Sequence, residues 1–186
     1  MKLYKFLEIL SENFSTFMKR RRFKKFGKNS KILTRSKLNK PENIEVGENV
    51  YISSDVWLNA NNWREDDRAS LIINDGSYIG RFCQINAFKD VIIEKNVLIA
   101  DNVYLGDVDH SYEDETLAIQ QNKIKYKGNI LLKEGSFICR NVVISANTIV
   151  GKNSIVAPNT YVTKKNIPDY HMAIGNPCRV FKIKND

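Results

Sequence analysis

Residues 132–160 read LKEGSF-ICRNVV-ISANTI-VGKNSI-VAPNT when they are written in groups of six. Every group opens with an aliphatic residue. The fifth position is small or β-branched throughout: Ser136, Val142, Thr148, Ser154 and Thr160. The fourth position is Gly135 in the first group and asparagine in the other four. A fixed period of this kind indicates a repeat architecture, and it has to be recognised before any secondary structure is assigned.

The same columns extend back to Val46. The aliphatic opening positions are Val46, Ile52, Ile73, Ile79, Ile93, Ile99, Leu132, Ile138, Ile144, Val150 and Val156. Three places after each of them stands Asn, Asp or Gly in ten of the eleven repeats, with Phe82 as the exception. These three residue types tolerate the positive φ angle of a sharp turn. A turn every six residues predicts a parallel β-helix, an all-β coil of short strands with its aliphatic column inside.

The period is interrupted at three places. It breaks over residues 59–72, shifts by two at Lys89-Asp90, and stops for more than 20 residues from about Asp107 to Asn129. A long loop in so regular a coil is usually functional or disordered. This one contains His110. We therefore predict a β-helix domain over 31–186, with a protruding loop at 107–129 and a tail at 163–186 that leaves the repeat.

The N-terminal segment has a different pattern. Leu3, Leu7, Leu10, Phe14 and Phe17 recur at steps of four and three, which places them on one face of a helix. Residues 1–28 carry a net +7 of the chain's +8. We predict a basic amphipathic helix within 1–30. It either packs on the solenoid as a cap, the commoner use of such a stripe, or lies on an anionic membrane. Nucleic acid is not expected as a partner, because no recognition motif accompanies the cluster.

Composition narrows the class of protein. The 186 residues are 42% hydrophobic and 27% charged, as expected for one compact domain. The sequence contains no run of about 18 apolar residues, so no membrane-spanning helix is expected. The start of the chain lacks the apolar core of a secretory signal. Cys83, Cys139 and Cys178 are odd in number and widely spaced, so they suggest neither a disulfide framework nor a metal site. These features predict a cytoplasmic protein.

In its repeat columns, the sequence resembles the hexapeptide-repeat acyltransferases. The resemblance covers roughly residues 44–184 and is nearest to the galactoside, maltose and polysaccharide O-acetyltransferases. It rests on the repeat, on the stretch NVYLGDVDH at 102–110, and on the ending IP at 167–168 with GNP at 175–177. It implies a left-handed β-helix, acetyl-CoA as co-substrate, no metal, and a homotrimer whose sites are each completed by two subunits.

The resemblance also implies that His110 is the general base. Imidazole titrates near neutral pH, so it can take the proton of a sugar hydroxyl as the oxygen attacks the thioester. Because the thioester is already activated, we expect direct attack in a ternary complex, with backbone N–H groups stabilising the oxyanion. An imidazole usually needs an orienting group. Asp109, Glu113, Asp114 and a backbone carbonyl are all candidates.

Two further groups of residues are implied to contact the substrates. Asn86 matches a position that contacts the acceptor, although it could instead be another corner asparagine. Tyr112 could stack on a sugar or pack under the loop. The residues expected along acetyl-CoA are Phe137, Arg140, Ala157, Pro158 and Thr163, with Arg179 and Lys182 as the bases that would meet its 3′-phosphate. Arg140 departs from the small residue common at its place, and solvated charge is the alternative for Arg179 and Lys182.

The expected function is O-acetylation of a saccharide hydroxyl, for instance on a precursor of a surface polysaccharide at the inner face of the membrane. One alternative is N-acetylation of a nucleotide-linked amino sugar, and another is a non-catalytic β-helix that serves as a binding module. His171 matches no catalytic position, and we interpret it as a surface residue. The chain has only two histidines. The zinc-dependent carbonic anhydrases of this fold use three, so that class is not expected.

Overall fold

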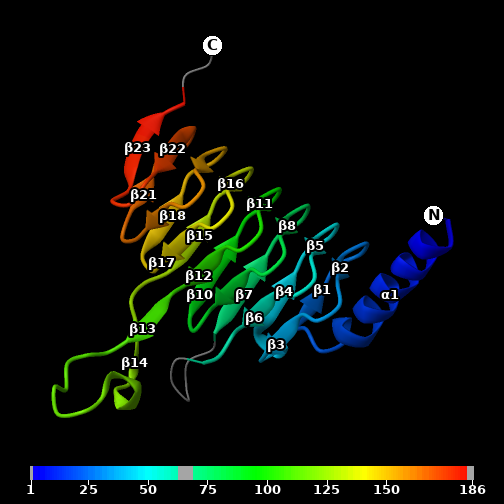
Figure 1. Cartoon of the computed structure of the whole chain (residues 1–186), viewed down its shortest axis with the longest axis horizontal. Helices are drawn as coiled ribbons and strands as arrows, with labels where there is room; N and C mark the ends of the chain where they lie inside the picture. Colours follow the sequence, from blue (N-terminus) through cyan, green and yellow to red (C-terminus); the bar gives the residue numbers. More distant parts are fainter. Residues whose placement is uncertain (1, 63–68, 184–186) are drawn as a thin grey trace.

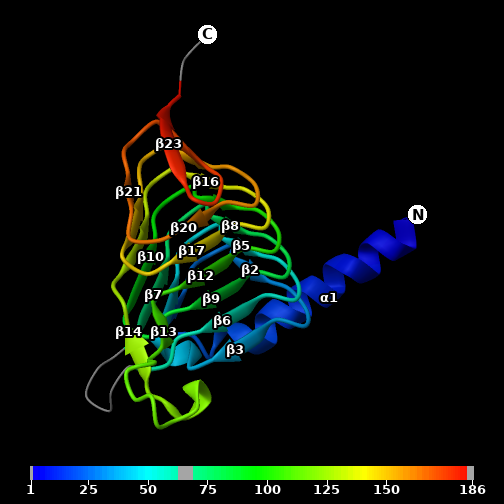
Figure 2. The same cartoon turned by 60° about the vertical axis from the view of Figure 1, so that its left-hand side comes forward.

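The fold is that of a computed structural model, which describes residues 2–62 and 69–183. The helix α1 (Lys2–Arg20) is followed by a solenoid whose strands stack in three parallel sheets (Figures 1 and 2). Two short 3-10 helices interrupt it, η1 (Pro41–Asn43) and η2 (Ile119–Gln121). Part of the predicted break over residues 59–72, namely 63–68, lies outside the described residues.

Each face of the solenoid is one sheet. Sheet A runs in the order β1 (Lys25–Phe26), β4 (Ile44–Val46), β7 (Ser70–Ile73), β10 (Asp90–Ile93), β15 (Ile130–Leu132), β18 (Thr148–Val150) and β21 (Asn166–Ile167). Sheet B contains β2 (Lys31–Ile32), β5 (Tyr51–Ile52), β8 (Tyr78–Ile79), β11 (Leu98–Ile99), β16 (Phe137–Ile138), β19 (Ile155–Val156), β22 (His171–Ile174) and β23 (Arg179–Lys182). Sheet C contains β3 (Lys37–Asn39), β6 (Trp57–Asn59), β9 (Gln84–Asn86), β12 (Tyr104–Gly106), β17 (Val143–Ser145) and β20 (Tyr161–Val162).

The predicted columns are the core and the corners of this solenoid. All eleven aliphatic opening residues are 0% exposed. All eleven residues of the turn column have positive φ, between 50° at Asn153 and 71° at Gly135. Side-chain amides add to the stacking at one corner, where Asn102 donates to Asn141 and Asn141 donates to Asn159, at 2.8 and 3.1 Å. The prediction of a left-handed parallel β-helix is confirmed.

Phe82 occupies a turn position that suits asparagine. Its φ is 58° and its side chain is 55% exposed, so the phenyl ring contributes little buried area to offset the backbone strain. We expect Phe82→Asn to raise the free energy of unfolding by about 1 kcal/mol. Chemical denaturation measures this. The matched control is Val143→Asn, which introduces asparagine at a 38% exposed apolar residue on the extended strand β17. No gain, or the same gain in both variants, would contradict the argument.

The solenoid begins earlier than the sequence pattern indicates. Strands β1 and β2 pair in parallel with β4 and β5, so a first coil starts at Lys25, whereas the predicted domain boundary follows residue 30. The turns of this coil place Asn29, Arg35 and Lys40 at positive φ. Arginine and lysine are not typical of such positions. This is why the column of turn residues did not reveal the coil.

The loop, and the tail as far as Ile183, take up strand and turn structure. Residues 163–174 continue the coil as β21 and β22, with Lys164 and Tyr170 at the turns, so the expectation that the chain leaves the coil after Val162 is wrong. Strand β23 departs from the coil and pairs antiparallel with β22 at the end of sheet B. The loop 107–129 forms an antiparallel hairpin of β13 (Val108–His110) and β14 (Ile124–Tyr126), which protrudes from the solenoid in Figure 2.

Helix α1 covers the open edge of sheet B with its polar face. The Thr16 hydroxyl accepts a hydrogen bond from the Ile32 N–H at 3.0 Å and lies 3.3 Å from the Ile32 carbonyl oxygen. Lys19 Nζ donates to the Leu33 carbonyl at 2.7 Å, and burial lowers the pKa of Lys19, with a smaller contribution from Arg22. These contacts satisfy edge groups that would otherwise be open to another strand.

The apolar stripe of α1 points the other way. Leu7, Leu10, Phe14 and Phe17 are 54%, 49%, 67% and 52% exposed, while the side chain of Leu3 lies outside the described part. The expectation that this stripe packs on the solenoid is therefore wrong. The physical reason is that an edge strand offers N–H and C=O groups, which hydroxyl and ammonium groups satisfy and apolar groups do not.

Candidate active site

The hairpin that carries His110 is anchored by a buried carboxylate. Asp107 directly follows β12 and is 0% exposed. Its carboxylate accepts the N–H groups of Phe88, at 2.9 and 3.0 Å, and of Lys89, at 2.8 Å. The Asp107 carbonyl accepts the Lys127 N–H at 2.9 Å, so one residue holds both ends of the hairpin against the solenoid. Burial raises the pKa of this carboxyl, and the N–H donors oppose the shift.

His110 ends strand β13 and its side chain is exposed. Its backbone N–H donates to Asp109 Oδ1 at 2.8 Å. Glu113 is paired with Lys125, and the Asp114 carboxylate accepts from the hydroxyl and the N–H of Thr116. The three acidic candidates for orienting the imidazole are thus engaged elsewhere. Among the described residues, no hydrogen bond reaches the His110 ring.

Residues of the hairpin line two hollows. One of about 410 Å³ lies within it and is lined by Ser111, Glu113, Asp114, Leu117, Gln121, Asn122, Lys123, Ile124 and Lys125. The other, of about 290 Å³, lies between the hairpin and the late coils and is lined by Asp109, Tyr112, Lys127, Ser145, Ala146, Tyr161, Thr163 and Lys164. The second brings together three residues predicted for the site: Asp109, Tyr112 and Thr163. Tyr112 is 72% exposed, so it does not pack under the loop.

Asn86 lies in a buried polar row along sheet C. It is 8% exposed and sits within the extended strand β9, so it is not a corner residue. Its Oδ1 accepts from Asn59 at 3.1 Å and its Nδ2 lies 3.3 Å from the Tyr104 hydroxyl. Register pairs Asn86 with Gly106, where a Cβ atom would collide with that hydroxyl. The buried polar row therefore ends at Gly106, just before the chain leaves the solenoid to form the hairpin.

The residues predicted for acetyl-CoA lie mainly on other faces. Phe137 is half-buried on β16, and Arg140 and Pro158 are exposed at the turns between sheets B and C, where Ala157 is 7% exposed. Arg179 and Lys182 are exposed on β23. In both Figures 1 and 2, β16 and β23 lie on the opposite side of the solenoid from β13 and β14. One copy of the chain thus keeps His110 apart from the residues on these strands.

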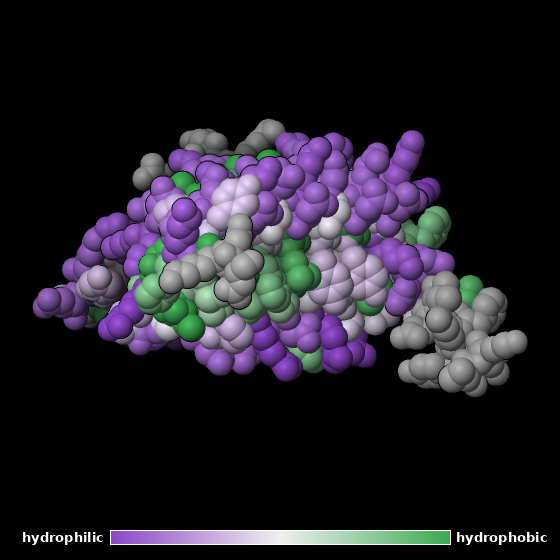
Figure 3. Space-filling model, turned by 90° about the horizontal axis from the view of Figure 1, so that it is seen from above, coloured by the Kyte–Doolittle hydropathy of each residue, from purple (hydrophilic) through white to green (hydrophobic). Residues whose placement is uncertain are grey.

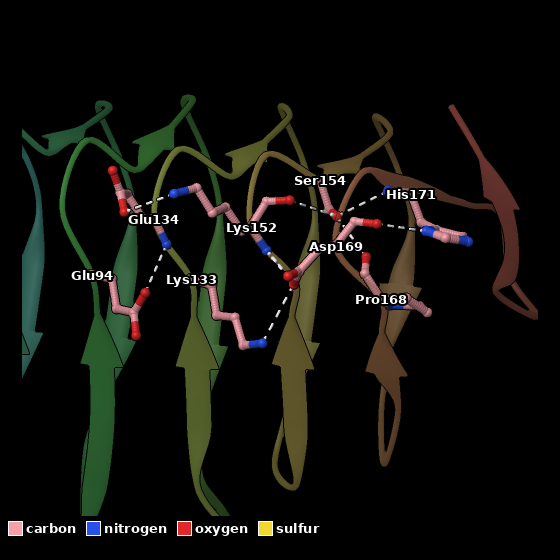
Figure 4. A network of polar contacts seen from close by, with 8 residues as sticks. All are labelled: Glu94, Lys133, Glu134, Lys152, Ser154, Pro168, Asp169 and His171. Atoms are coloured by element: carbon pink, nitrogen blue, oxygen red, sulfur yellow. Dashed lines mark hydrogen bonds and ion pairs between the residues drawn. The ribbon is translucent and has the colours of Figure 1, made fainter. Parts of the chain in front are cut away.

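The second histidine belongs to a structural network at the turns between sheets A and B (Figure 4). His171 Nδ1 lies 2.8 Å from the Asp169 carbonyl oxygen, and its backbone N–H donates to Ser154 Oγ at 3.0 Å. The Asp169 carboxylate accepts the Lys152 N–H at 2.8 Å, the main cause that lowers its pKa. His171 is half-buried, and its ring contact lies within its own turn.

The described residues contain neither a group of metal ligands nor a membrane-spanning helix. Among residues 2–62 and 69–183, no three His, Cys, Asp or Glu side chains gather as ligands for a metal ion. Along the same residues, no helix combines the length and apolar character that crossing a membrane requires.

Comparison with solved structures defines the class of fold. The N-acyltransferase AntD from Bacillus cereus, in complex with dTDP and 3-hydroxybutyryl-CoA, superposes with a TM-score of 0.76 at 20% identity, covering 91% of this chain and 87% of that one. A hexapeptide-repeat acetyltransferase from Vibrio cholerae complexed with acetyl-CoA gives 0.62 at 19% identity, covering 91% and 76%. A maltose O-acetyltransferase from Clostridium difficile gives 0.60 at 22% identity, covering 90% and 73%.

Among curated proteins, the chain is similar to the probable acetyltransferase Rv3034c of Mycobacterium tuberculosis, with 31% identity over 113 residues. The match covers 61% of this chain and spans only 37% of that relative's length. No family model matches the chain. The resemblance to hexapeptide-repeat acyltransferases, expected from the repeat columns, is confirmed by these similarities, and the solved structures establish the fold.

Proposed function

We propose that this protein is a CoA-dependent acyltransferase that moves an acetyl group from acetyl-CoA to a saccharide hydroxyl, with His110 as the general base. The observation that carries the proposal is the anchored hairpin. It carries the exposed His110 between Asp109 and Ser111, each of which lines a hollow, on a solenoid whose structural neighbours were crystallised with CoA or acetyl-CoA. An exposed loop histidine is common on any protein surface, but one on an anchored hairpin of this fold is a candidate general base.

In the proposed reaction, the imidazole accepts the hydroxyl proton while the oxygen attacks the thioester carbonyl. The C–O bond forms, the C–S bond breaks, and the CoA thiolate leaves and takes up a proton. Backbone N–H groups stabilise the oxyanion. No covalent enzyme intermediate is needed, because the thioester is already reactive. The exposure of His110 is compatible with this route. The three cysteines are free thiols, which supports a cytoplasmic location.

Cysteine labelling tests whether a thiol could be the nucleophile instead. Cys83 is 1% exposed, donates to the Ala100 carbonyl at 3.0 Å, and burial raises its pKa to about 11. Cys178 is only half-buried. We expect iodoacetamide at pH 8 to modify Cys178 first and to reach Cys83 only after unfolding, as read by peptide mass spectrometry. Rapid loss of activity together with labelling of Cys83 in the folded protein would favour a covalent mechanism.

The proposed site is completed by a second copy, in a homotrimer. The outward residues of sheet B form an apolar row that includes Tyr78, Leu98 and Phe181, which are 37%, 42% and 53% exposed, and the half-buried Phe137. Figure 3 looks down on the upper side of Figure 1, where sheet B lies, and shows hydrophobic residues gathered across its middle. An exposed apolar row of this length supports burial against another subunit.

Light scattering tests the assembly. We expect the wild-type chain to have the mass of a trimer and Leu98→Glu to lower that mass and the activity together, because a charge in the apolar row cannot be buried unpaired. Ile119→Glu, an equally drastic change at the 62% exposed tip of the hairpin, is the control for mass. A wild-type monomer that is fully active would contradict the shared site.

A second candidate function is N-acylation of a nucleotide-linked amino sugar. The observation that favours it is the extent of the similarity to AntD, whose crystals contain dTDP or dTDP-4-amino-4,6-dideoxyglucose with CoA. A panel of free sugars and dTDP-linked amino sugars separates the two functions, since the product is an ester in one case and an amide in the other. Binding of acetyl-CoA with no transfer to any acceptor would support the third candidate, a non-catalytic binding module.

A further inference from the structure

The outer stripe of α1, formed by Leu7, Leu10, Phe14 and Phe17, is not covered by any other element among the described residues. Each of the four side chains is about half or more exposed, from 49% at Leu10 to 67% at Phe14. The spacing of the four places them on one side of the helix. The opposite side is the one that contacts the solenoid, through Thr16 and Lys19. In Figures 1 and 2 the helix projects from the N-terminal end of the coil.

A group of cations adjoins the C-terminal end of the stripe. Arg20, Arg21 and Arg22 are exposed, as are Lys25 on β1 and Lys28 just after that strand. The guanidinium carbons of Arg20 and Arg21 lie 5.7 and 5.8 Å from the centre of the Phe17 ring. Arg20 and Arg21 therefore stand beside the apolar surface. Glu12, the acidic side chain described in α1, is paired with Lys31 of the solenoid and does not offset them.

We propose that the outer stripe and this basic group dock the protein on a membrane that contains anionic phospholipids. The apolar side chains would enter the boundary between headgroups and acyl chains, and the arginines and lysines would meet the phosphates. A second copy is a poorer partner for the stripe. Residues 1–28 carry a net +7, so stacking two such helices would bring their positive charges together, whereas anionic lipid is complementary to them.

Vesicle flotation with the full-length protein tests this surface. We expect binding to vesicles of phosphatidylcholine with about 30% phosphatidylglycerol at about 0.1 M salt, and much weaker binding to phosphatidylcholine alone. Leu10→Ser/Phe14→Ser and, separately, Arg20→Glu/Arg21→Glu/Arg22→Glu should each lower the bound fraction by about tenfold or more. The matched control is Ile119→Ser/Ile174→Ser, which removes two exposed aliphatic residues outside α1 and should leave binding unchanged. The substituted side chains are exposed, and unfolding midpoints confirm that each variant folds.

Three results would overturn the proposal. They are no flotation with anionic vesicles, equal flotation of the Leu10→Ser/Phe14→Ser variant, and equal loss in the control variant. A fourth would assign the stripe to another occupant: if Leu10→Ser/Phe14→Ser lowers the mass measured by light scattering and the wild type ignores vesicles, the stripe joins copies of this chain. Because flotation does not depend on acyl transfer, failure here leaves the proposed function standing.

Discussion

His110→Ala is expected to lower kcat/KM for acetyl transfer by about 10²–10⁴-fold, the range that a general base contributes. The effect should fall on kcat, with little change in the affinity for acetyl-CoA, because the imidazole acts on the acceptor hydroxyl as the transition state forms. The side chain is exposed and makes no described hydrogen bond, so the variant should keep its unfolding midpoint. Steady-state kinetics and a thermal melt measure the two quantities.

The control is the other histidine. His171→Ala removes a ring whose contact is with the Asp169 carbonyl, while the backbone bond from residue 171 to Ser154 is retained. We expect His171→Ala to keep most of the activity and to lose a little stability. If both variants lose activity equally, or if His110→Ala retains it, the role assigned to His110 is wrong.

Asp107→Ala is expected to destabilise the fold by about 2–4 kcal/mol. It leaves the N–H groups of Phe88 and Lys89 buried without an acceptor, at a cost of about 1–3 kcal/mol for each unsatisfied group. It also releases the anchor of the hairpin, so activity should fall as His110 loses its fixed position. Chemical denaturation and steady-state kinetics measure the two effects on the same preparation.

Asp101→Ala is the matched control for this variant. Asp101 also accepts a backbone N–H from the preceding coil, that of Arg81 at 2.8 Å, but it is only half-buried and water can replace it. We expect a loss of no more than about 1 kcal/mol there. Equal losses in Asp101→Ala and Asp107→Ala would contradict the importance given to the buried anchor.

The pH dependence of the Asp107 contribution follows from the direction of its pKa. Burial raises the pKa above the ordinary 3.8, so the folded state holds this proton more tightly than the unfolded chain does. The resulting stabilisation is complete below the ordinary value and is lost as the pH rises through the raised value. The deficit of Asp107→Ala relative to the wild type should therefore be largest in acid and narrow above that range. A deficit that widens with rising pH would contradict this sign.

The solenoid could be predicted wherever the turn positions carry residue types that tolerate positive φ. The turn column fixes where positive φ is needed, and even Phe82 adopts it because the neighbouring coils determine the path of the chain. The first coil escaped prediction because Arg35 and Lys40 take the same backbone conformation without the usual residue types. Neighbouring coils impose that conformation, and single-residue preference is too weak to override them.

The orientation of α1 and the anchor of the hairpin could not be predicted from the sequence. A helical stripe indicates which side chains share a face, but the groups opposite that face depend on tertiary structure. Here an open edge strand selects Thr16 and Lys19 in place of the apolar side chains. Asp107 follows a glycine at the end of a strand, a pattern shared with ordinary exposed turns. Only the fold shows that Phe88 and Lys89 aim their N–H groups at it.

Three residues predicted for the candidate site, Asp109, Tyr112 and Thr163, line one hollow between the hairpin and the late coils. Their roles remain predictions. Phe137, Arg179 and Lys182 lie on β16 and β23, away from the hairpin in the same copy, and the repeat pattern does not show which coils lie near the hairpin. Asn86 was expected to contact the acceptor or to be a corner asparagine. It lies within β9, where its amide accepts from Asn59 and lies beside the Tyr104 hydroxyl.

The most direct test of the central claim is to incubate the protein with acetyl-CoA and a panel of hydroxyl and amino sugars, and to follow free CoA and acetylated product by mass spectrometry. We predict stoichiometric formation of CoA and an acetylated sugar by the wild type, and strongly reduced formation of both by His110→Ala. Absence of acetyl-CoA binding by calorimetry, together with no product from any acceptor, would contradict the account.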